Sequence, residues 1–252
     1  MKKSFFLLTI LFLAACSETR KDQAEQPASP IYTLVFLDKT RSVDPNDNFV
    51  KTKYAAAIKK LVDRNIRTEG DVLEVYFIHE NTSKARAMTI RSRTVKEDTE
   101  GLSPTDREAA DNAYDLSIKK ERQVIYNALM QKFMEPNTSA SNSETNISAS
   151  VPVISAALET SPDVHAYFFS DMVESMRSGR DFHSRAPQSP EQALTWAKED
   201  AGRYASHHLN GAEVHVILPF SPNSSSRINN PNVTEYWKTF FGALGAGKVT
   251  EE

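Results

Sequence analysis

The chain has 252 residues, a length that suits one α/β domain or two small ones. Charged residues make up 25% of the sequence and apolar residues 40%, as is typical of a soluble globular protein. The formal net charge is −3, so the sequence lacks the basic surplus of nucleic-acid-binding proteins, and we expect no nucleic acid partner. Because Cys16 is the only cysteine, no intramolecular disulfide can form.

The chain begins with the layout of a secretory signal, "MKKSFFLLTILFLAAC". Lys2 and Lys3 form a short positive segment, and an apolar stretch from Phe5 to Leu13 follows. This stretch is shorter than a membrane-spanning helix requires. The pattern therefore predicts a signal peptide rather than a transmembrane anchor.

The end of this segment, "LAAC", resembles the lipobox of bacterial lipoproteins. The resemblance implies cleavage before Cys16, with residues 1–15 as the lipoprotein signal peptide and Cys16 as the lipidated residue. It also favours the outer membrane, because Ser17 rather than Asp follows Cys16. Several acyl chains would give a lasting attachment to the cell envelope. The alternative is a plain signal peptide with a chance cysteine.

Residues 16–30 are polar after Cys16 and contain Pro27 and Pro30. We interpret them as a flexible tether, which could reach roughly 45 Å when stretched. The remaining residues, 31–252, are expected to form one domain.

Strand and helix patterns alternate along this domain. Short apolar runs predict strands at residues 32–38, 71–79, 85–93, 163–170 and 212–220. Helical periodicity predicts helices at residues 49–65, 146–158, 190–206 and 233–244, and one long or bent helix that begins after Ser103 and ends before Pro136.

This order predicts an α/β fold, a three-layer αβα Rossmann-like sandwich with a mostly parallel sheet. The two strands at 71–79 and 85–93 are joined by a short turn, so we expect a hairpin that adds one antiparallel edge strand. Ligands bind such sheets beyond the carboxyl ends of the strands. Asp38 and the pair Ser170–Asp171 lie at two of these ends.

Asp38 ends an apolar strand, and a carboxylate there must be paired, hydrogen-bonded or bound to a metal. One interpretation is phosphoryl transfer. The stretch "DKTRS" looks like the "DKTGT" of cation-pumping ATPases in the haloacid dehalogenase superfamily, which would make Asp38 a nucleophile and the protein a phosphatase. Asp171 and Glu174 would then hold magnesium. Thr40 departs from this pattern, because most soluble members have an Asp at that position.

A second interpretation is a metal site built from hydroxyls and carboxylates. The stretch "FLDKTRS" has the form D-x-T-x-S and resembles the D-x-S-x-S motif of von Willebrand factor A (vWA) domains, the metal-ion-dependent adhesion site. The segment "SETNISASVPVISAAL" supplies Thr145 before a helix, and "AYFFSDMVES" supplies Asp171 after a strand. The resemblance implies that residues 31–252 form a vWA-like domain. It also implies that Thr40, Ser42 and Thr145 bind the metal directly, while Asp38 and Asp171 act mainly through water.

The implied cofactor is Mg²⁺ or Mn²⁺, because hard divalent cations prefer oxygen ligands. Neutral hydroxyl ligands leave such an ion under-neutralised, so it retains affinity for a carboxylate from another molecule. This chemistry predicts a protein ligand bound through an acidic side chain, and binding rather than catalysis.

Thr145 is the weakest member of the predicted site. Ser143 and Glu144 stand where the family often has glycines, and Glu144 could repel an incoming carboxylate or serve as an internal ligand. Thr138 and Ser148 are alternatives to Thr145. A third interpretation of the whole pattern is structural, with Asp38 and Ser42 holding a turn in a metal-free domain.

Other chemical motifs are weak. His165 and His215 lie inside strands and are expected to be structural. The segment "GALGAGKVT" at the end of the chain has phosphate-loop spacing but follows a helix instead of a strand, so we expect a frayed C-terminus. The sequence contains no G-x-S-x-G, C-x-x-C or H-E-x-x-H motif.

Overall fold

The computed structural model describes residues 29–137, 144–221, 224–226 and 229–252. Its helices and strands, in chain order, are β1 (Tyr32–Asp38), α1 (Asn48–Asn65), β2 (Val72–Ile78), β3 (Arg86–Arg91), α2 (Pro104–Met134), α3 (Val151–Leu158), β4 (Val164–Phe169), α4 (Pro190–Ala201), β5 (Glu213–Ile217), α5 (Pro231–Ala243) and β6 (Lys248–Glu251). The short 3₁₀ helices η1 (Thr82–Lys84), η2 (Ser148–Ser150) and η3 (Gly202–Tyr204) join them.

The predicted signal peptide, the lipidated Cys16 and most of the tether lie outside the described residues. No helix within the described ranges combines the length and the apolar character that a membrane span requires.

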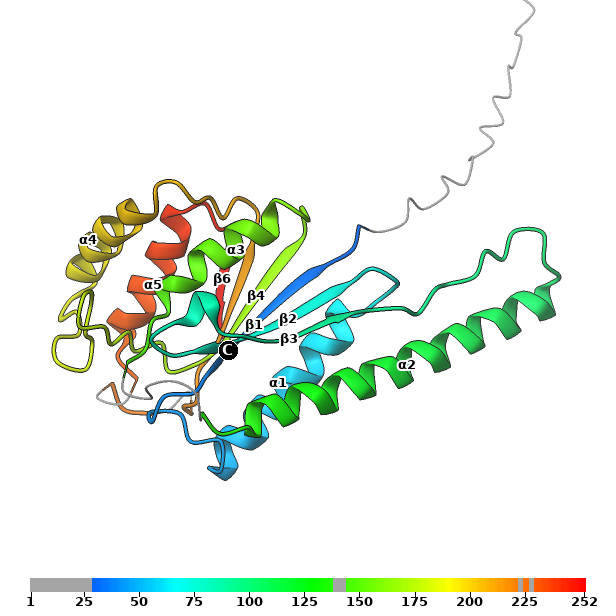
Figure 1. Ribbon diagram of the computed structural model, residues 1–252, viewed down its shortest axis with the longest axis horizontal. Helices are drawn as coiled ribbons and strands as arrows, with labels where there is room; N and C mark the ends of the chain where they lie inside the picture. Colours follow the sequence, from blue (N-terminus) through cyan, green and yellow to red (C-terminus); the bar gives the residue numbers. More distant parts are fainter. Residues whose placement is uncertain (1–28, 138–143, 222–223, 227–228) are drawn as a thin grey trace, which may run out of the picture.

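The six strands form one sheet in the order β3-β2-β1-β4-β5-β6. Every neighbouring pair is parallel except β2 and β3, which run antiparallel at the edge. Helices α1 and α2 cover one face, and α3, α4 and α5 cover the other (Figure 1). This confirms the predicted three-layer αβα fold with one antiparallel edge strand, the arrangement expected of a vWA-like domain.

The central strands are apolar on both sides because helices cover both faces of the sheet. In β1, Phe36 contacts the α3–α5 layer and Leu37 contacts the α1–α2 layer. Phe36 stacks on Phe168 of β4 with ring centroids 4.7 Å apart. Both strands are thereby held rigidly at the point where their carboxyl ends carry polar residues.

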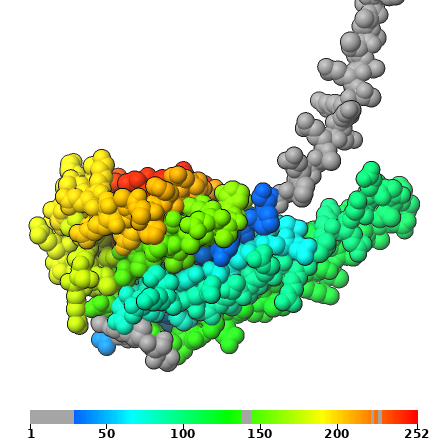
Figure 2. Space-filling model, turned by 45° about the horizontal axis from the view of Figure 1, so that its top comes forward, coloured from blue at the N-terminus to red at the C-terminus, as the bar shows by residue number. Residues whose placement is uncertain are grey.

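Helix α2 is one continuous helix of 31 residues. Of the two predicted possibilities, a long helix or a bent one, the structure has the long helix. The Ser103 side chain caps it by accepting a hydrogen bond from the Asp106 amide. Its buried residues, from Ile118 to Phe133, lie in the second half. The first half extends past the end of the sheet (Figures 1 and 2).

The expectation of a frayed C-terminus was wrong. Residues after α5 form β6, which pairs in parallel with β5 from Glu213↔Lys248 to Val216↔Glu251. Gly245 makes the turn possible: its φ is +97°, and a Cβ there would lie 2.1 Å from the Asn210 side-chain oxygen. Without β6, the backbone of β5 would be an unpaired sheet edge.

Candidate metal site at the carboxyl ends of β1 and β4

The candidate site lies where the chain order reverses in the sheet. From β1 the chain proceeds outwards on one side to β2 and β3, and later on the other side to β4, β5 and β6. The crevice between the carboxyl ends of β1 and β4 is therefore the topological switch point, where α/β sheets bind ligands. Asp38 is the last residue of β1, and Asp171 follows β4.

Hydroxyl groups surround the Asp38 carboxylate. Its Oδ1 accepts hydrogen bonds from the Thr40 amide at 2.8 Å and the Thr40 hydroxyl at 2.5 Å. Its Oδ2 accepts a hydrogen bond from the Ser170 hydroxyl at 2.6 Å. The Thr40 and Ser42 hydroxyl oxygens are 3.1 Å apart. The residues of the D-x-T-x-S motif therefore meet in one hydrogen-bonded cluster.

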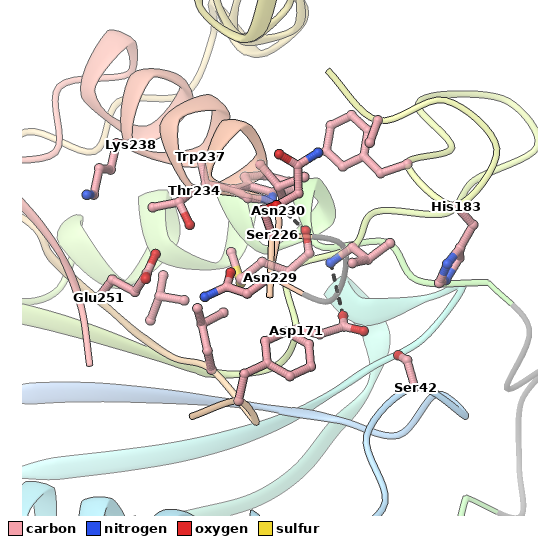
Figure 3. A pocket seen from close by; sticks show the side chains of 18 of the residues that line it. Ser42, Asp171, His183, Ser226, Asn229, Asn230, Thr234, Trp237, Lys238 and Glu251 are labelled. Atoms are coloured by element: carbon pink, nitrogen blue, oxygen red, sulfur yellow. Dashed lines mark hydrogen bonds between the residues drawn. The ribbon is translucent and has the colours of Figure 1, made fainter. Parts of the chain in front are cut away.

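Asp171 joins this cluster from the other strand. The Ser42 hydroxyl and the Asp171 carboxylate lie next to each other (Figure 3), and the hydroxyl acts to lower the pKa of Asp171. Asp171 Oδ1 also accepts a hydrogen bond from the Val173 amide at 3.0 Å. The structure thus brings together Asp38, Thr40, Ser42 and Asp171, four of the five predicted ligands.

The turn after β4 is held in an unusual conformation. Met172 has a φ of +60°, a left-handed conformation that costs energy in a residue with a side chain. Two side chains fix it: the Met172 amide donates to Ser170 Oγ at 3.0 Å, and Trp237 Nε1 donates to the Met172 carbonyl at 2.7 Å. These contacts direct the neighbouring Asp171 towards Ser42.

The two carboxylates are buried and close enough to influence each other. Asp38 is 4% exposed and Asp171 is 7% exposed. Burial, and then the charge of Asp171, raise the pKa of Asp38 to about 7. Burial also raises the pKa of Asp171. Among the described residues neither carboxylate forms an ion pair with a basic side chain, so a bound cation would stabilise both.

Lys39, although adjacent to Asp38, does not neutralise it by direct contact. Its ammonium group donates three hydrogen bonds of 2.7 Å to the carbonyls of Lys132, Phe133 and Glu135 at the end of α2. Burial lowers the pKa of Lys39 to about 8. The sequence analysis missed this role, because the partners lie more than 90 residues away along the chain.

Thr145 lies at the same edge of the sheet but outside the hydrogen-bonded cluster. Its backbone pairs with Ser175 through hydrogen bonds of 3.0 and 2.9 Å. The next amide, that of Asn146, donates to the His79 carbonyl just after β2 at 3.3 Å. Thr145 is buried. Its backbone position is therefore well anchored next to the strand ends.

The neighbours of Thr145 have partners of their own. Glu144 pairs with Arg177 at 2.9 Å, so its charge is already balanced. Ser148 donates to Glu174 Oε1 at 2.7 Å. The other alternative, Thr138, lies outside the described residues.

Glu174 caps the segment that begins α3. Its Oε2 accepts hydrogen bonds from the amides of Ile147 at 2.6 Å and Ser148 at 3.3 Å, and burial raises its pKa to about 7. Glu174 shares no hydrogen-bond partner with Asp38 or Asp171 among the described residues. This does not favour the phosphatase interpretation, in which Asp171 and Glu174 would hold magnesium together.

A cavity of about 630 Å³ opens beside the cluster. Ser42 and Asp171 contribute to its wall, and apolar groups, including Trp237 and Leu218, also line it. Lys238 and Glu251 lie at the far side from Ser42 (Figure 3). A ligand could therefore reach the cluster with a polar group while its apolar part occupies the cavity.

These features define the chain as a three-layer α/β domain with an oxygen-rich cluster at the switch point of its sheet. No protein-family model matches the sequence. No curated protein matches it either.

Among the solved structures that resemble the chain are three proteins with low sequence identity and low TM-scores. One is a von Willebrand factor type A protein from Catenulispora acidiphila, with 14% identity, a TM-score of 0.36, and coverage of 89% of this chain and 39% of that chain. A second is proximal thread matrix protein 1 from the mussel byssus, with 13% identity, a TM-score of 0.31, and coverage of 89% and 42%. A third is a mutant of the PilB minor pilin from Streptococcus sanguinis, with 14% identity, a TM-score of 0.40, and coverage of 90% and 58%. The chain thus spans about 40 to 60% of the length of these proteins.

Proposed function

We propose that this protein binds protein partners through a divalent cation, Mg²⁺ or Mn²⁺, held at the carboxyl ends of β1 and β4. The observation that carries the proposal is the pair of buried carboxylates, Asp38 and Asp171, which lie in one cluster of hydroxyl groups and have no basic ion-pair partner among the described residues.

The donor set suits a hard cation. All the side chains of the cluster offer oxygen atoms, the ligand type that Mg²⁺ prefers. Thr40, Ser42 and Thr145 would contribute hydroxyl ligands. Asp38 and Asp171 would interact with the cation mainly through water. The bound cation supplies positive charge that can accept a carboxylate from a partner.

The cavity beside the cluster supports a macromolecular ligand. Its apolar lining is adjacent to Asp171, so the same partner segment could place a carboxylate on the cation and an apolar side chain against Trp237. The buried carboxylates and hydroxyls of the cluster are all oxygen donors of the kind that a hard cation binds, so binding is the function that we infer from the geometry.

The proposed location follows from the N-terminal pattern. Cleavage before Cys16 and lipidation of that residue would attach the domain to the outer membrane. Residues 16–30 would then act as the tether between the lipid and β1.

Calorimetric titration of the full chain with Mg²⁺ and Mn²⁺ tests the metal site. We expect one ion per chain, and at least tenfold weaker binding in Asp38→Ala and Ser42→Ala. Asp44→Ala is the matched control, because Asp44 is an exposed carboxylate in the same loop whose Oδ1 caps the Asn46 amide. Absence of binding, or equal affinity in all four proteins, would sink the proposal.

A further inference from the structure

A second cluster of metal-ligating side chains lies at the amino-terminal ends of β4 and β5. His165 is in β4, Glu213 and His215 are in β5, and one ligand atom from each lies within 4.8 Å of the other two. His165 pairs with Glu213 in the sheet register, and side chains alternate along a strand, so all three share the face covered by α1. Asp171 lies six positions after His165, which corresponds to roughly 20 Å along the strand direction.

The distances are close to those of a tetrahedral zinc site. Glu213 Oε2 lies 3.2 Å from His215 Nε2 and 3.9 Å from His165 Nδ1. Ligand atoms bound to tetrahedral zinc at about 2.0–2.1 Å are roughly 3.3 Å apart. Small side-chain rotations would therefore bring the three atoms to bonding distance of one ion.

His165 presents a buried nitrogen without a hydrogen-bond partner. Its Nε2 is 2.8 Å from Asp163 Oδ1, and because a carboxylate only accepts, Nε2 carries the proton. Nδ1 therefore has a free lone pair, and it is buried with no hydrogen-bond partner in the described part of the chain. The residue is 5% exposed. A histidine that binds a metal usually donates its other ring N–H to a carboxylate or a similar acceptor, which fixes the orientation of the ring.

The ring of His215 is also held by neighbouring side chains and is suited to bind a metal. Its Nδ1 lies 2.9 Å from Thr250 Oγ1, and its ring stacks on Tyr167 with centroids 4.5 Å apart. Burial lowers the pKa of His215, which favours the neutral ring that metals bind. When Nε2 bonds a metal, the ring proton moves to Nδ1 and is donated to Thr250. A cavity of about 20 Å³ next to His215 is large enough for one water-sized occupant.

We propose that His165, Glu213 and His215 form a zinc site, separate from the Asp38 cluster. Two imidazole nitrogens and one carboxylate oxygen suit Zn²⁺ better than Mg²⁺, which prefers oxygen ligands. The positive charge of Arg64 would repel a bound cation, because the guanidinium lies 2.9 Å from Glu213 Oε2. Its side chain is 46% exposed, so it can swing away when zinc binds.

The test is zinc titration of the full chain, stripped of metal, in competition with a chromophoric chelator. We expect one Zn²⁺ per chain, held at least tenfold more weakly in His165→Gln, His215→Gln and Glu213→Gln. Asp163→Asn should weaken binding roughly tenfold, as removal of such supporting groups does. Arg64→Gln should strengthen it severalfold by removing the competing charge. Co²⁺ in place of zinc should give the visible absorption of a tetrahedral site.

Two controls separate this site from others. The double variant His207→Gln/His208→Gln, at a pair of histidines outside the cluster of which one is half-buried and one exposed, and Asp38→Ala should both bind zinc as the wild type does. If the histidine variants fail to fold, the zinc affinity of Glu213→Gln is the decisive measurement, because this substitution preserves the shape of a half-buried side chain. The proposal is overturned if the wild type binds no zinc at micromolar concentration, or if the folded ligand variants retain its affinity.

Discussion

At the scale of residues, the carboxyl end of the sheet holds ionisable groups in three different states. Asp38 and Asp171 are buried with hydroxyl neighbours and no basic partner among the described residues. The Lys39 ammonium group is buried, which lowers its pKa, and donates hydrogen bonds to three carbonyls at the end of α2. Glu174 is held by amides and a hydroxyl. Each environment predicts a different response to pH or substitution.

Glu174→Gln should change how stability depends on pH. Burial raises the folded-state pKa of Glu174 to about 7, above its unfolded value, so its protonated form favours folding. This contribution is fully present below pH ~4.5 and is lost as pH rises through 7. We expect the wild type to lose about 3 kcal/mol relative to Glu174→Gln between pH 4.5 and 8. Urea unfolding of both proteins across this range measures the difference, and parallel pH profiles would contradict it.

Lys39→Met should loosen the C-terminal end of α2. The substitution preserves the apolar length of the side chain but removes three hydrogen bonds to carbonyls. Because hydrogen bonds to charged groups are strong, we expect a loss of about 2 kcal/mol in the free energy of unfolding. Lys132→Met is the control: its partner Glu135 is a surface carboxylate, so the expected change is below about 0.5 kcal/mol. Similar losses in both variants would refute the role of Lys39.

At the scale of elements, the last strand closes one side of the sheet. β6 pairs only with β5, and the Glu252 backbone continues the ladder through hydrogen bonds with Val216 and Leu218. The neighbouring α5 packs its aromatic residues against the same core, which includes Trp237 and Phe241. β6 therefore protects both the edge of β5 and one wall of the large cavity, where Val249 and Glu251 lie.

Truncation after Gly247 should destabilise the protein and promote self-association. The truncated chain loses the β5–β6 ladder and exposes β5 as an edge strand. We expect a loss of about 3 kcal/mol, on the basis of about 1 kcal/mol per net hydrogen bond. Thermal unfolding and light scattering measure both effects, with Lys248→Ala as the control for the exposed first residue of β6. A truncated protein with unchanged stability would contradict a structural role for β6.

At the scale of the whole molecule, the proposed sites lie at opposite ends of one sheet. The Asp38 cluster is at the carboxyl ends of the strands, and the His165 cluster is at their amino ends. The chain enters the sheet at β1, whose first residue, Tyr32, is at the same end as His165. The Asp38 end of the sheet is therefore the end farther from residue 31, at which the predicted tether would join the domain.

Cys16→Ser should release the protein from the membrane. The proposed lipid is attached to that cysteine alone, so the variant would lose its anchor while the domain, which begins at residue 31, stays intact. We expect the wild type in the membrane fraction and the variant in the soluble fraction, with mass spectrometry showing acyl chains on Cys16 of the wild type. An unmodified Cys16 in the mature protein would defeat the proposal.

The sequence by itself determined the layered fold and the end of the sheet where the candidate site lies. Hydrophobic periodicity is a local property, so it located β1, α1 and β4 to within a few residues. The carboxyl ends of parallel strands must share one edge, so Asp38 and Asp171 could be placed together without coordinates.

Only the tertiary structure decided which side chains complete each site. Ser170 bonds to Asp38 across two strands, Lys39 reaches the end of α2, and Glu174 turns towards Ser148. The pairing of His165 with Glu213, and the strand β6, likewise depend on strand register between distant segments. No local pattern encodes such contacts, because they form only when the packing of the sheet and its helices fixes the register and direction of each side chain.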